Sequence, residues 1–162
     1  MREYPLIPEL QAPMNSGTQQ VESMSLEHAL SVIRDTFAVD RSPRFRMFVK
    51  GQPTPLKPAT QEQICLISRK AVINAVRHSE ATHVETEIEY LPRVVRVVIR
   101  DNGRGIDPEV VQSGKAHHWG LAAMRERAEE IGAQLRVWSR SGAGTEVEIS
   151  VPKDFAASAC AS

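Results

Sequence analysis

The chain is poor in the residues that mark several special classes of protein. Its two cysteines, Cys65 and Cys160, lie far apart and lack the spacing of a metal or redox motif. We therefore expect free thiols in a reducing compartment. No apolar run reaches eighteen residues, and Pro5 and Pro8 interrupt the region where a signal-peptide core would lie. These absences favour a cytoplasmic fragment without direct membrane contact, although a parent protein could be anchored in the inner membrane.

Net charge is also lacking. Twenty basic and twenty acidic residues cancel, so the electrostatic footprint of a nucleic-acid-binding protein is absent. The composition, 41% hydrophobic and 25% charged, is typical of a globular domain. A chain of 162 residues can build one core without disulfides or a structural metal. No internal repeat or low-complexity segment is found, so we expect a single domain.

The spacing of apolar residues predicts an α+β domain. Helices are expected over 26–37 with Ser25 as N-cap, over about 59–79 beginning after Pro58, over 120–131 ending at Gly132, and briefly over 107–112. Alternating or β-branched segments predict strands at 44–50, 82–90, 94–100, 134–140 and 144–151, the last two forming a hairpin. A mixed sheet covered on one face by helices is the economical arrangement. Its other face would be solvated or would contact a partner domain.

The boundaries of the domain follow from composition. Residues 1–22 mix Pro, Gln, Ser and Gly without periodicity, so we expect a flexible lead-in or the end of an upstream linker. The folded domain is predicted over 23–153. Residues 154–162 are mostly small, with four alanines and two serines, and are expected to form a disordered tail.

Four short motifs suggest a nucleotide pocket. Asp101-Asn-Gly-Arg-Gly-Ile106 follows a strand, Asn74 lies in a helix, Gly120-Leu121 opens another helix, and Gly142-Ala-Gly-Thr145 joins two strands. A buried Asp can accept a hydrogen bond from an adenine amino group, and an Asn oxygen suits Mg²⁺. Glycines allow the backbone to approach phosphates closely. Each motif alone is weak, because Asn-Gly is an ordinary turn dipeptide, but their combination favours nucleotide binding.

Less specific explanations compete at several of these positions. Asp101 could simply form a turn, Arg77 could be a solvated helix charge, and His78 is as well explained by packing as by binding. His117 and His118 could suggest a metal, but no Cys or acidic partner has ligand spacing nearby, which favours a phosphate-facing loop over 113–119. Trp119 could pack beneath that loop or cover the nucleotide, whereas Trp138 is expected to pack on the sheet.

These motifs resemble the ATP-binding domain of sensor histidine kinases. The resemblance covers roughly residues 25–152 and rests on the phrases Asn-Ala-Val-Arg-His at 74–78, Asp-Asn-Gly-Arg-Gly at 101–105, Gly-Leu-Ala-Ala-Met-Arg-Glu-Arg-Ala at 120–128, and Gly-Ala-Gly-Thr at 142–145. It implies the Bergerat fold of the gyrase, Hsp90, histidine kinase and MutL superfamily. The Met-Arg-Glu-Arg phrase at 124–127 is close to the subclass that partners helix-turn-helix response regulators.

The resemblance also implies roles for individual residues. Asn74 would bind the Mg²⁺ that bridges the ATP phosphates, and Asp101 would accept from adenine. The remaining implied contacts with the nucleotide are Arg77, His78, Gly103, Gly105, Ile106, His118, Gly120, Leu121, Gly144 and Thr145. Segment 113–119 would be the ATP lid. The implied partners are a histidine-containing dimerisation domain, upstream or in trans, and indirectly a response regulator.

Two features depart from the family pattern. Lys70 stands where relatives often carry a Glu one helical turn before the Asn, so a role for it in catalysis is doubtful and gyrase-like hydrolysis is not expected. The phosphoacceptor phrase of a dimerisation helix is also missing, because His28 is followed by Ala29 rather than by an acid. The chain therefore resembles the catalytic portion of a longer kinase or a domain that acts in trans.

Two other functions remain open from the sequence. A serine kinase of the anti-sigma-factor type would share the Asn and Asp-x-Gly-x-Gly motifs, but the phrase at 120–128 is not expected there. A nucleotide-binding or interaction module without catalysis is favoured only by Lys70. Phosphotransfer to a supplied dimerisation domain would separate a kinase from such a binding module.

Overall fold

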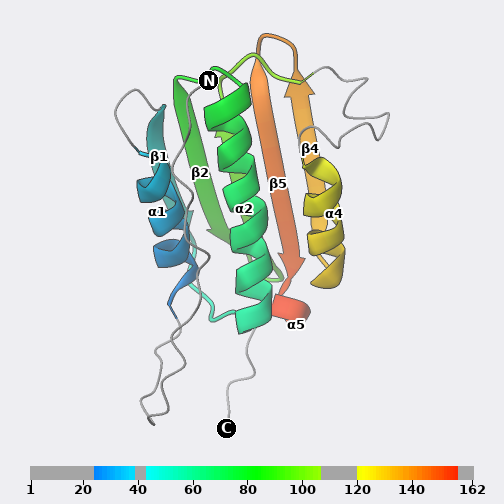
Figure 1. Ribbon diagram of the computed structural model, residues 1–162. Helices are drawn as coiled ribbons and strands as arrows, with labels where there is room; N and C mark the ends of the chain where they lie inside the picture. Colours follow the sequence, from blue (N-terminus) through cyan, green and yellow to red (C-terminus); the bar gives the residue numbers. More distant parts are fainter. Residues whose placement is uncertain (1–23, 39–42, 107–119, 157–162) are drawn as a thin grey trace, which may run out of the picture.

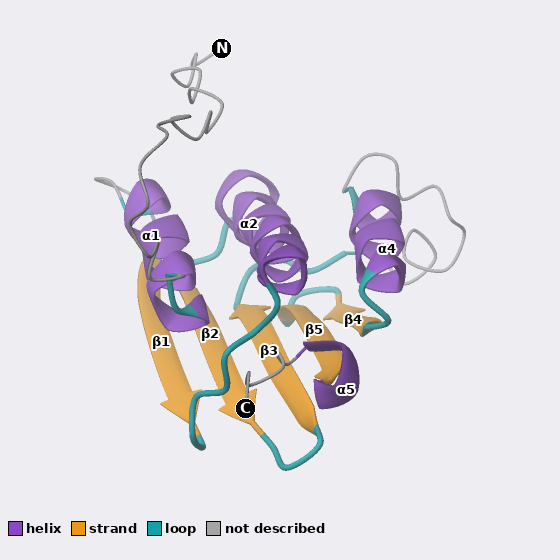
Figure 2. Cartoon of the chain, turned by 90° about the horizontal axis from the view of Figure 1, so that it is seen from below, coloured by secondary structure: helices purple, strands orange, loops and turns teal. Residues whose placement is uncertain are grey.

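The computed structural model describes residues 24–38, 43–106 and 120–156, which form two layers. The helices are α1 (Leu26–Phe37), α2 (Pro58–His78), α4 (Leu121–Glu130) and α5 (Lys153–Ala156); the strands are β1 (Arg44–Lys50), β2 (His83–Tyr90), β3 (Val94–Asp101), β4 (Gln134–Arg140) and β5 (Gly144–Pro152). Helices α1, α2 and α4 lie side by side over one face of the sheet, as Figure 2 shows from below. The predicted α+β sandwich is therefore confirmed.

The sheet is mixed and its strand order differs from the chain order. Strands follow the order β1-β2-β3-β5-β4, with β1 parallel to β2 and the other pairs antiparallel. The expected hairpin of β4 and β5 is present. Its second strand is inserted between β3 and β4 (Figure 1), so the last long strand of the chain is internal in the sheet.

The helix boundaries agree with the capping signals in the sequence. The hydroxyl oxygen of Ser25 accepts from the His28 amide at 3.2 Å, and Pro58 occupies the first turn of α2, where its missing N–H costs nothing. Helix α4 ends at a left-handed Gly132. The amides of Gly132 and Ala133 donate there to the carbonyls of Glu129 and Ala128, which is a Schellman cap.

The core lies between α2 and the inner face of the sheet. The buried side of α2 carries Ile64, Ile67, Ala71 and Ala75, four residues that recur at three- and four-residue spacing. They pack against the inward residues of the central strands, which are Val84, Ile88, Val95, Val97, Ile99, Val147, Ile149 and Val151. Because α2 spans the middle of the sheet, it holds both the core and one wall of the pocket described below.

The outer face of the sheet carries charges of alternating sign from strand to strand. Basic residues on β3 lie between acidic residues on β2 and β5: Arg96 pairs with Glu89 and Glu148, and Arg100 with Glu85, Glu87 and Glu146. Beneath these ion pairs the side chain of Val98 is fully buried. This face is therefore covered by its own network of ion pairs, in which the acidic side chains outnumber the basic ones.

Some expectations differ from the structure or fall outside it. Trp138 lies on the outer face of β4 with 48% of its surface exposed, so it is not a core residue. Helix α5 occupies 153–156, where the tail was expected to begin. The predicted lead-in at 1–22 and the helix at 107–112 lie outside the described residues. Within the described part of the chain, no helix is long and apolar enough to cross a membrane.

Candidate functional site

Asp101 is the last residue of β3, at the edge where the strand meets the end of α2. Its Oδ1 accepts from the Gly103 amide at 2.8 Å, which closes a tight turn. That turn rests on Ser79, because the Arg104 amide donates to the Ser79 carbonyl at 2.7 Å. A Cβ on Gly103 would overlap with the carbonyl and side chain of Ser79. Glycine is thus required at position 103 because the strand end and the helix end approach so closely.

The side chain of Asp101 is partly buried, and the donors around its carboxylate compensate incompletely for the lost contact with water. Burial raises its pKa above the usual range, although the Gly103 amide, the Ser79 hydroxyl and the Thr145 amide act in the opposite direction. The Ser79 hydroxyl also donates to the Ala75 carbonyl at 2.6 Å, and its single proton can serve only one acceptor at a time. A ligand N–H would therefore stabilise the ionised carboxylate further, as expected for an adenine acceptor.

The Gly142–Thr145 turn packs directly on this strand end. Thr145 pairs with Asp101 in the β3–β5 register, as the resemblance implied. Gly144 has a φ of +90°, and a Cβ there would overlap with the Asp101 carbonyl. The Ser139 hydroxyl lies 2.9 Å from that of Thr145 and accepts from the Ile106 amide at 2.6 Å. Ser139 therefore joins two of the predicted motifs.

The pocket between these turns is walled by α2. Its lining consists of Ala71, Asn74, Ser79, Ile99, Asp101, Gly105, Ile106, Leu121, Thr145 and Val147. The side-chain oxygen of Asn74 is buried there. The structure thus brings Asn74, Asp101, Gly105, Ile106, Leu121 and Thr145 together in one cavity.

The cavity is narrow in this conformation, with a free volume of about 20 Å³. That space is smaller than one water molecule's share of the liquid, about 30 Å³, so an adenine ring requires the lining to move. A more open hollow of about 500 Å³ lies around Arg100, Trp138, Arg140 and Glu146. Asp101 and Thr145 line both spaces, but Asn74 and Gly105 line the narrow cavity alone, so we assign the nucleotide to that cavity.

Cationic groups gather near the end of α2. The pKa of His78 is lowered by burial first and then by the nearby charges of Arg77, Lys70 and Arg104. His78 is consequently shifted toward its neutral form. Arg104 belongs to the Asp-Asn-Gly-Arg-Gly motif, but no role was predicted for it. Arg77 and Arg104 thus place positive charge at this end of α2, and Lys70 adds a third cation two helical turns earlier.

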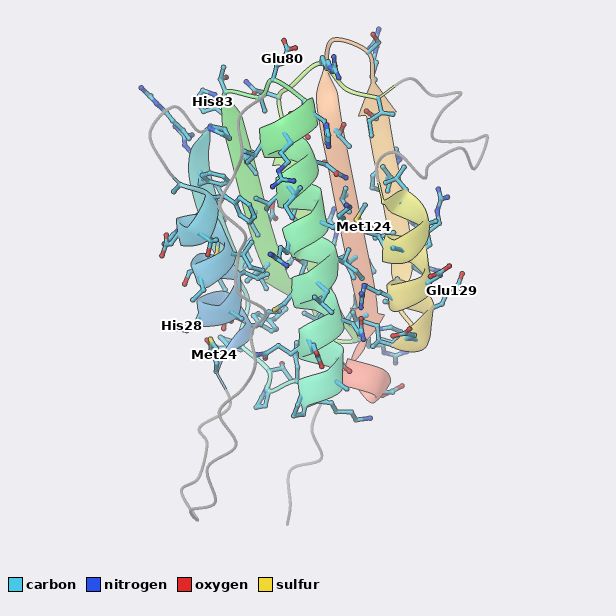
Figure 3. The ribbon with its side chains drawn as sticks, in the orientation of Figure 1. Met24, His28, Glu80, His83, Met124 and Glu129 are labelled. Atoms are coloured by element: carbon cyan, nitrogen blue, oxygen red, sulfur yellow. The ribbon has the colours of Figure 1, made fainter. Side chains whose placement is uncertain are left out.

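Lys70 reaches from α2 toward the start of α4. A Cβ added to Gly120 would overlap with the Lys70 side chain, so the two residues are in contact. Gly120 is the left-handed N-cap of α4 and provides no side-chain cap. Leu121 and Met124 are buried at the helix contact, and Figure 3 shows Met124 on the inner side of α4 and Glu129 on its outer side.

Several residues had roles that the sequence reasoning did not assign. Ser79 and Ser139 anchor the two glycine turns; a small hydroxyl residue directly after the Asn74–His78 phrase was the available signal for Ser79. Asn102, within the Asp-Asn-Gly-Arg-Gly motif, has a structural role. Its Oδ1 accepts hydrogen bonds from the amides of Thr82 and His83 at 3.0 and 2.9 Å. His118 and the predicted lid at 113–119 lie outside the described residues.

A magnesium ion fits the donors only as part of a nucleotide complex. The described residues contain no group of three His, Cys, Asp or Glu side chains able to hold a metal. Asn74 supplies one buried oxygen in the pocket. In nucleotide complexes, Mg²⁺ usually keeps several waters and binds the protein through one or two oxygens and the substrate through its phosphates. A single Asn74 oxygen matches this arrangement.

The comparisons with known proteins agree with this geometry. The profile of the histidine kinase-, DNA gyrase B-, and HSP90-like ATPase family matches residues 59–154, more than half of the chain. A histidine kinase domain from the blue-light activated histidine kinase of Erythrobacter litoralis superimposes with a TM-score of 0.64 at 21% identity, covering 80% of this chain and 61% of that one. At this identity the likeness concerns the fold.

Curated relatives are also similar in sequence. The sensor histidine kinase LiaS of Bacillus subtilis is 35% identical over 101 residues, covering 62% of this chain and 27% of LiaS. The nitrate/nitrite sensor protein NarQ of Escherichia coli is 34% identical over 131 residues, covering 80% of this chain and 23% of NarQ. The chain therefore spans about a quarter of the length of these relatives.

Proposed function

Because the chain belongs to the histidine kinase-, DNA gyrase B-, and HSP90-like ATPase family, we propose that it binds Mg-ATP in this pocket and donates the γ-phosphoryl group to a histidine on a separate dimerisation domain. Its ATP-binding part is of the sensor histidine kinase type. The observation that carries the proposal is the convergence of the partly buried Asp101 carboxylate and the Asn74 oxygen in one cavity. A response regulator would receive the phosphoryl group afterwards.

The proposed chemistry needs little from the protein beyond position and charge. The lone pair of an imidazole nitrogen forms the new P–N bond while the bond from the γ-phosphorus to the β,γ-bridging oxygen breaks, and ADP leaves with that oxygen. No water has to be activated, so a carboxylate base is not required. Asp101 fixes the adenine, Asn74 holds the metal, and the cations at the pocket mouth neutralise phosphate charge.

The position of His28 argues against this residue as the phosphoacceptor. His28 lies near the start of α1, whereas Glu80, beside the glycine turns, lies at the opposite end of the molecule (Figure 3). The described part of the chain thus places its α1 histidine far from the pocket mouth. The acceptor in this proposal belongs to a dimerisation domain supplied by a parent chain or in trans.

Titration calorimetry with ATP, with and without Mg²⁺, tests the binding part. The expected result is binding that strengthens with Mg²⁺; no heat and no thermal shift at millimolar ATP would contradict it. Transfer is tested by incubating the chain and radiolabelled ATP with the dimerisation domain of LiaS. Labelling of that domain's histidine supports the kinase, whereas nucleotide binding without transfer favours a binding module.

A further inference from the structure

Lys70 lies on α2 one helical turn before Asn74 and lines the groove between α2 and α4, next to the cavity. Lys70, Asn74 and His78 follow one another at four-residue intervals on α2, so they form one stripe along the helix. Asn74, in the middle of the stripe, lines the cavity. The stripe thus runs from the start of α4, past the metal-binding amide, to the glycine turn at the other end.

The contact with Gly120 fixes where the ammonium group lies. The terminal carbons and the Nζ atom of Lys70 occupy the space beside the Gly120 backbone. Gly120 precedes the ten residues of α4, and no side chain caps the first amides of that helix. A helix start of this kind attracts anions. The Lys70 cation and the α4 amides therefore converge on the same region.

The local charges point in the same direction. Besides Lys70, the charges that act on His78 come from Arg77 and Arg104, and all three are cationic. Lys70 also lines the groove between α2 and α4, together with Arg69 and Arg127 and the apolar Leu66, Ile73 and Met124. Among the residues that the structure describes, the lining of this groove includes no acidic side chain. An anionic ligand there would meet cationic and apolar side chains.

From this geometry we infer that Lys70 binds the γ-phosphate and makes the site prefer ATP over ADP. The inference rests on the proposed function. A Glu at this position would repel the terminal phosphate or act as a base, whereas a charged Lys can only neutralise it. ATP carries one phosphoryl group more than ADP, and that group is the one that leaves on transfer. Lys70 would thus select the loaded donor and release the spent nucleotide.

Calorimetry with both nucleotides in the presence of Mg²⁺ tests this role. The Lys70→Met variant keeps an unbranched stem against Gly120 but removes the charge. We expect about tenfold weaker ATP binding and less than about threefold weaker ADP binding. Lys70→Arg should keep the ATP preference, and Lys70→Glu should lose it further. The preference of the unmodified chain should also shrink at high salt, because the contact is ionic.

The matched control is Lys57→Met, at the N-cap of the same helix. It lies thirteen residues from Lys70, or about 20 Å along the helix axis, and should change neither affinity. If the unmodified chain binds neither nucleotide, the proposed function fails and the inference falls with it. The unmodified chain could instead bind both nucleotides while Lys70→Met weakens ATP and ADP binding equally, or weakens neither. That result would support the proposed nucleotide pocket but overturn the role of Lys70.

Discussion

Asp101 and Thr145 stand directly opposite each other at the end of the β3–β5 ladder, and the Thr145 amide contributes to holding the Asp101 carboxylate. Two motifs that lie more than forty residues apart are thus one unit in space. Substitutions at either motif should therefore report on the same binding event.

The Asp101→Asn variant should bind ATP more weakly while remaining folded. The loss of a charge-assisted acceptor costs about 1.5–3 kcal/mol, which is roughly tenfold or more in affinity. Asp35→Asn, on the exposed side of α1, is the matched control and should leave binding unchanged. Calorimetry measures both. Equal affinity of Asp101→Asn and the unmodified chain would reduce Asp101 to a turn residue.

Gly144→Ala should destabilise the protein more than Gly142→Ala. Both glycines have positive φ, so each alanine carries a backbone penalty of about 1–2 kcal/mol. Only the Cβ at 144 would meet the Asp101 backbone, whereas the space beside Gly142 is open. The additional overlap should cost about 1–3 kcal/mol. Urea unfolding of the two variants measures this difference in the free energy of unfolding. Similar unfolding midpoints would show that the backbone of the turn can shift to accommodate the extra methyl group.

His78 should make stability depend on pH in the weakly acidic range. Its folded-state pKa lies below the ordinary value for histidine, so the unfolded chain takes up a proton first as the pH falls through about 6.5. The free energy of unfolding should therefore decrease below that pH. His78→Gln should remove this part of the dependence, and His28→Gln on α1 is the control. Thermal melts between pH 5.5 and 7.5 measure this dependence. If the melting temperature changed with pH equally in all three proteins, His78 would not be its source.

Arg100→Met should destabilise the fold more than Arg34→Met. Arg100 contacts Glu87 and Glu146 on both neighbouring strands, and its loss leaves the nearly buried Glu87 with Lys50 alone. Because Arg100 is one-third exposed, we expect about 1–2 kcal/mol rather than the full cost of a buried charge. Arg34 pairs only with the exposed Asp35, where the loss should be near zero. Chemical unfolding at neutral pH makes the comparison.

The same network predicts acid sensitivity. Lys50 and Arg100 hold the pKa of Glu87 below its usual range. The unfolded chain therefore protonates first as the pH falls below about 4.3, and the stability that the pairs contribute is lost as the pH falls further. In Arg100→Met this loss should be smaller. An unchanged acid profile in that variant would mean that the pairs do not matter in solution.

The sequence predicted the elements of the fold well because its signals are local. Ser25, Pro58 and Gly132 act on their own helix ends, and the alternation in β3 follows from which face each residue buries. The insertion of β5 beside β3 was not predicted, because strand order depends on contacts far apart in the chain.

The sequence predicted those site residues that belong to recognisable motifs. Asn74, Asp101 and Thr145 were expected together and are together. Ser79 and Ser139 were missed because their importance comes from the distance between backbones, which no spacing in the sequence reveals. Trp138 was expected to pack on the sheet; it lies on the outer face of an edge strand instead, half exposed.

The internal place of β5 has a consequence for the order in which the protein can fold. β5 completes two ladders at once, yet it is the last long strand to leave the ribosome. A nascent chain ending before Gly144 lacks both the partner of β3 and the turn that rests on Asp101. Such closure between distant segments comes late in folding. Nucleotide binding should therefore appear only after the final hairpin has docked, so ATP would distinguish finished chains from partly folded ones.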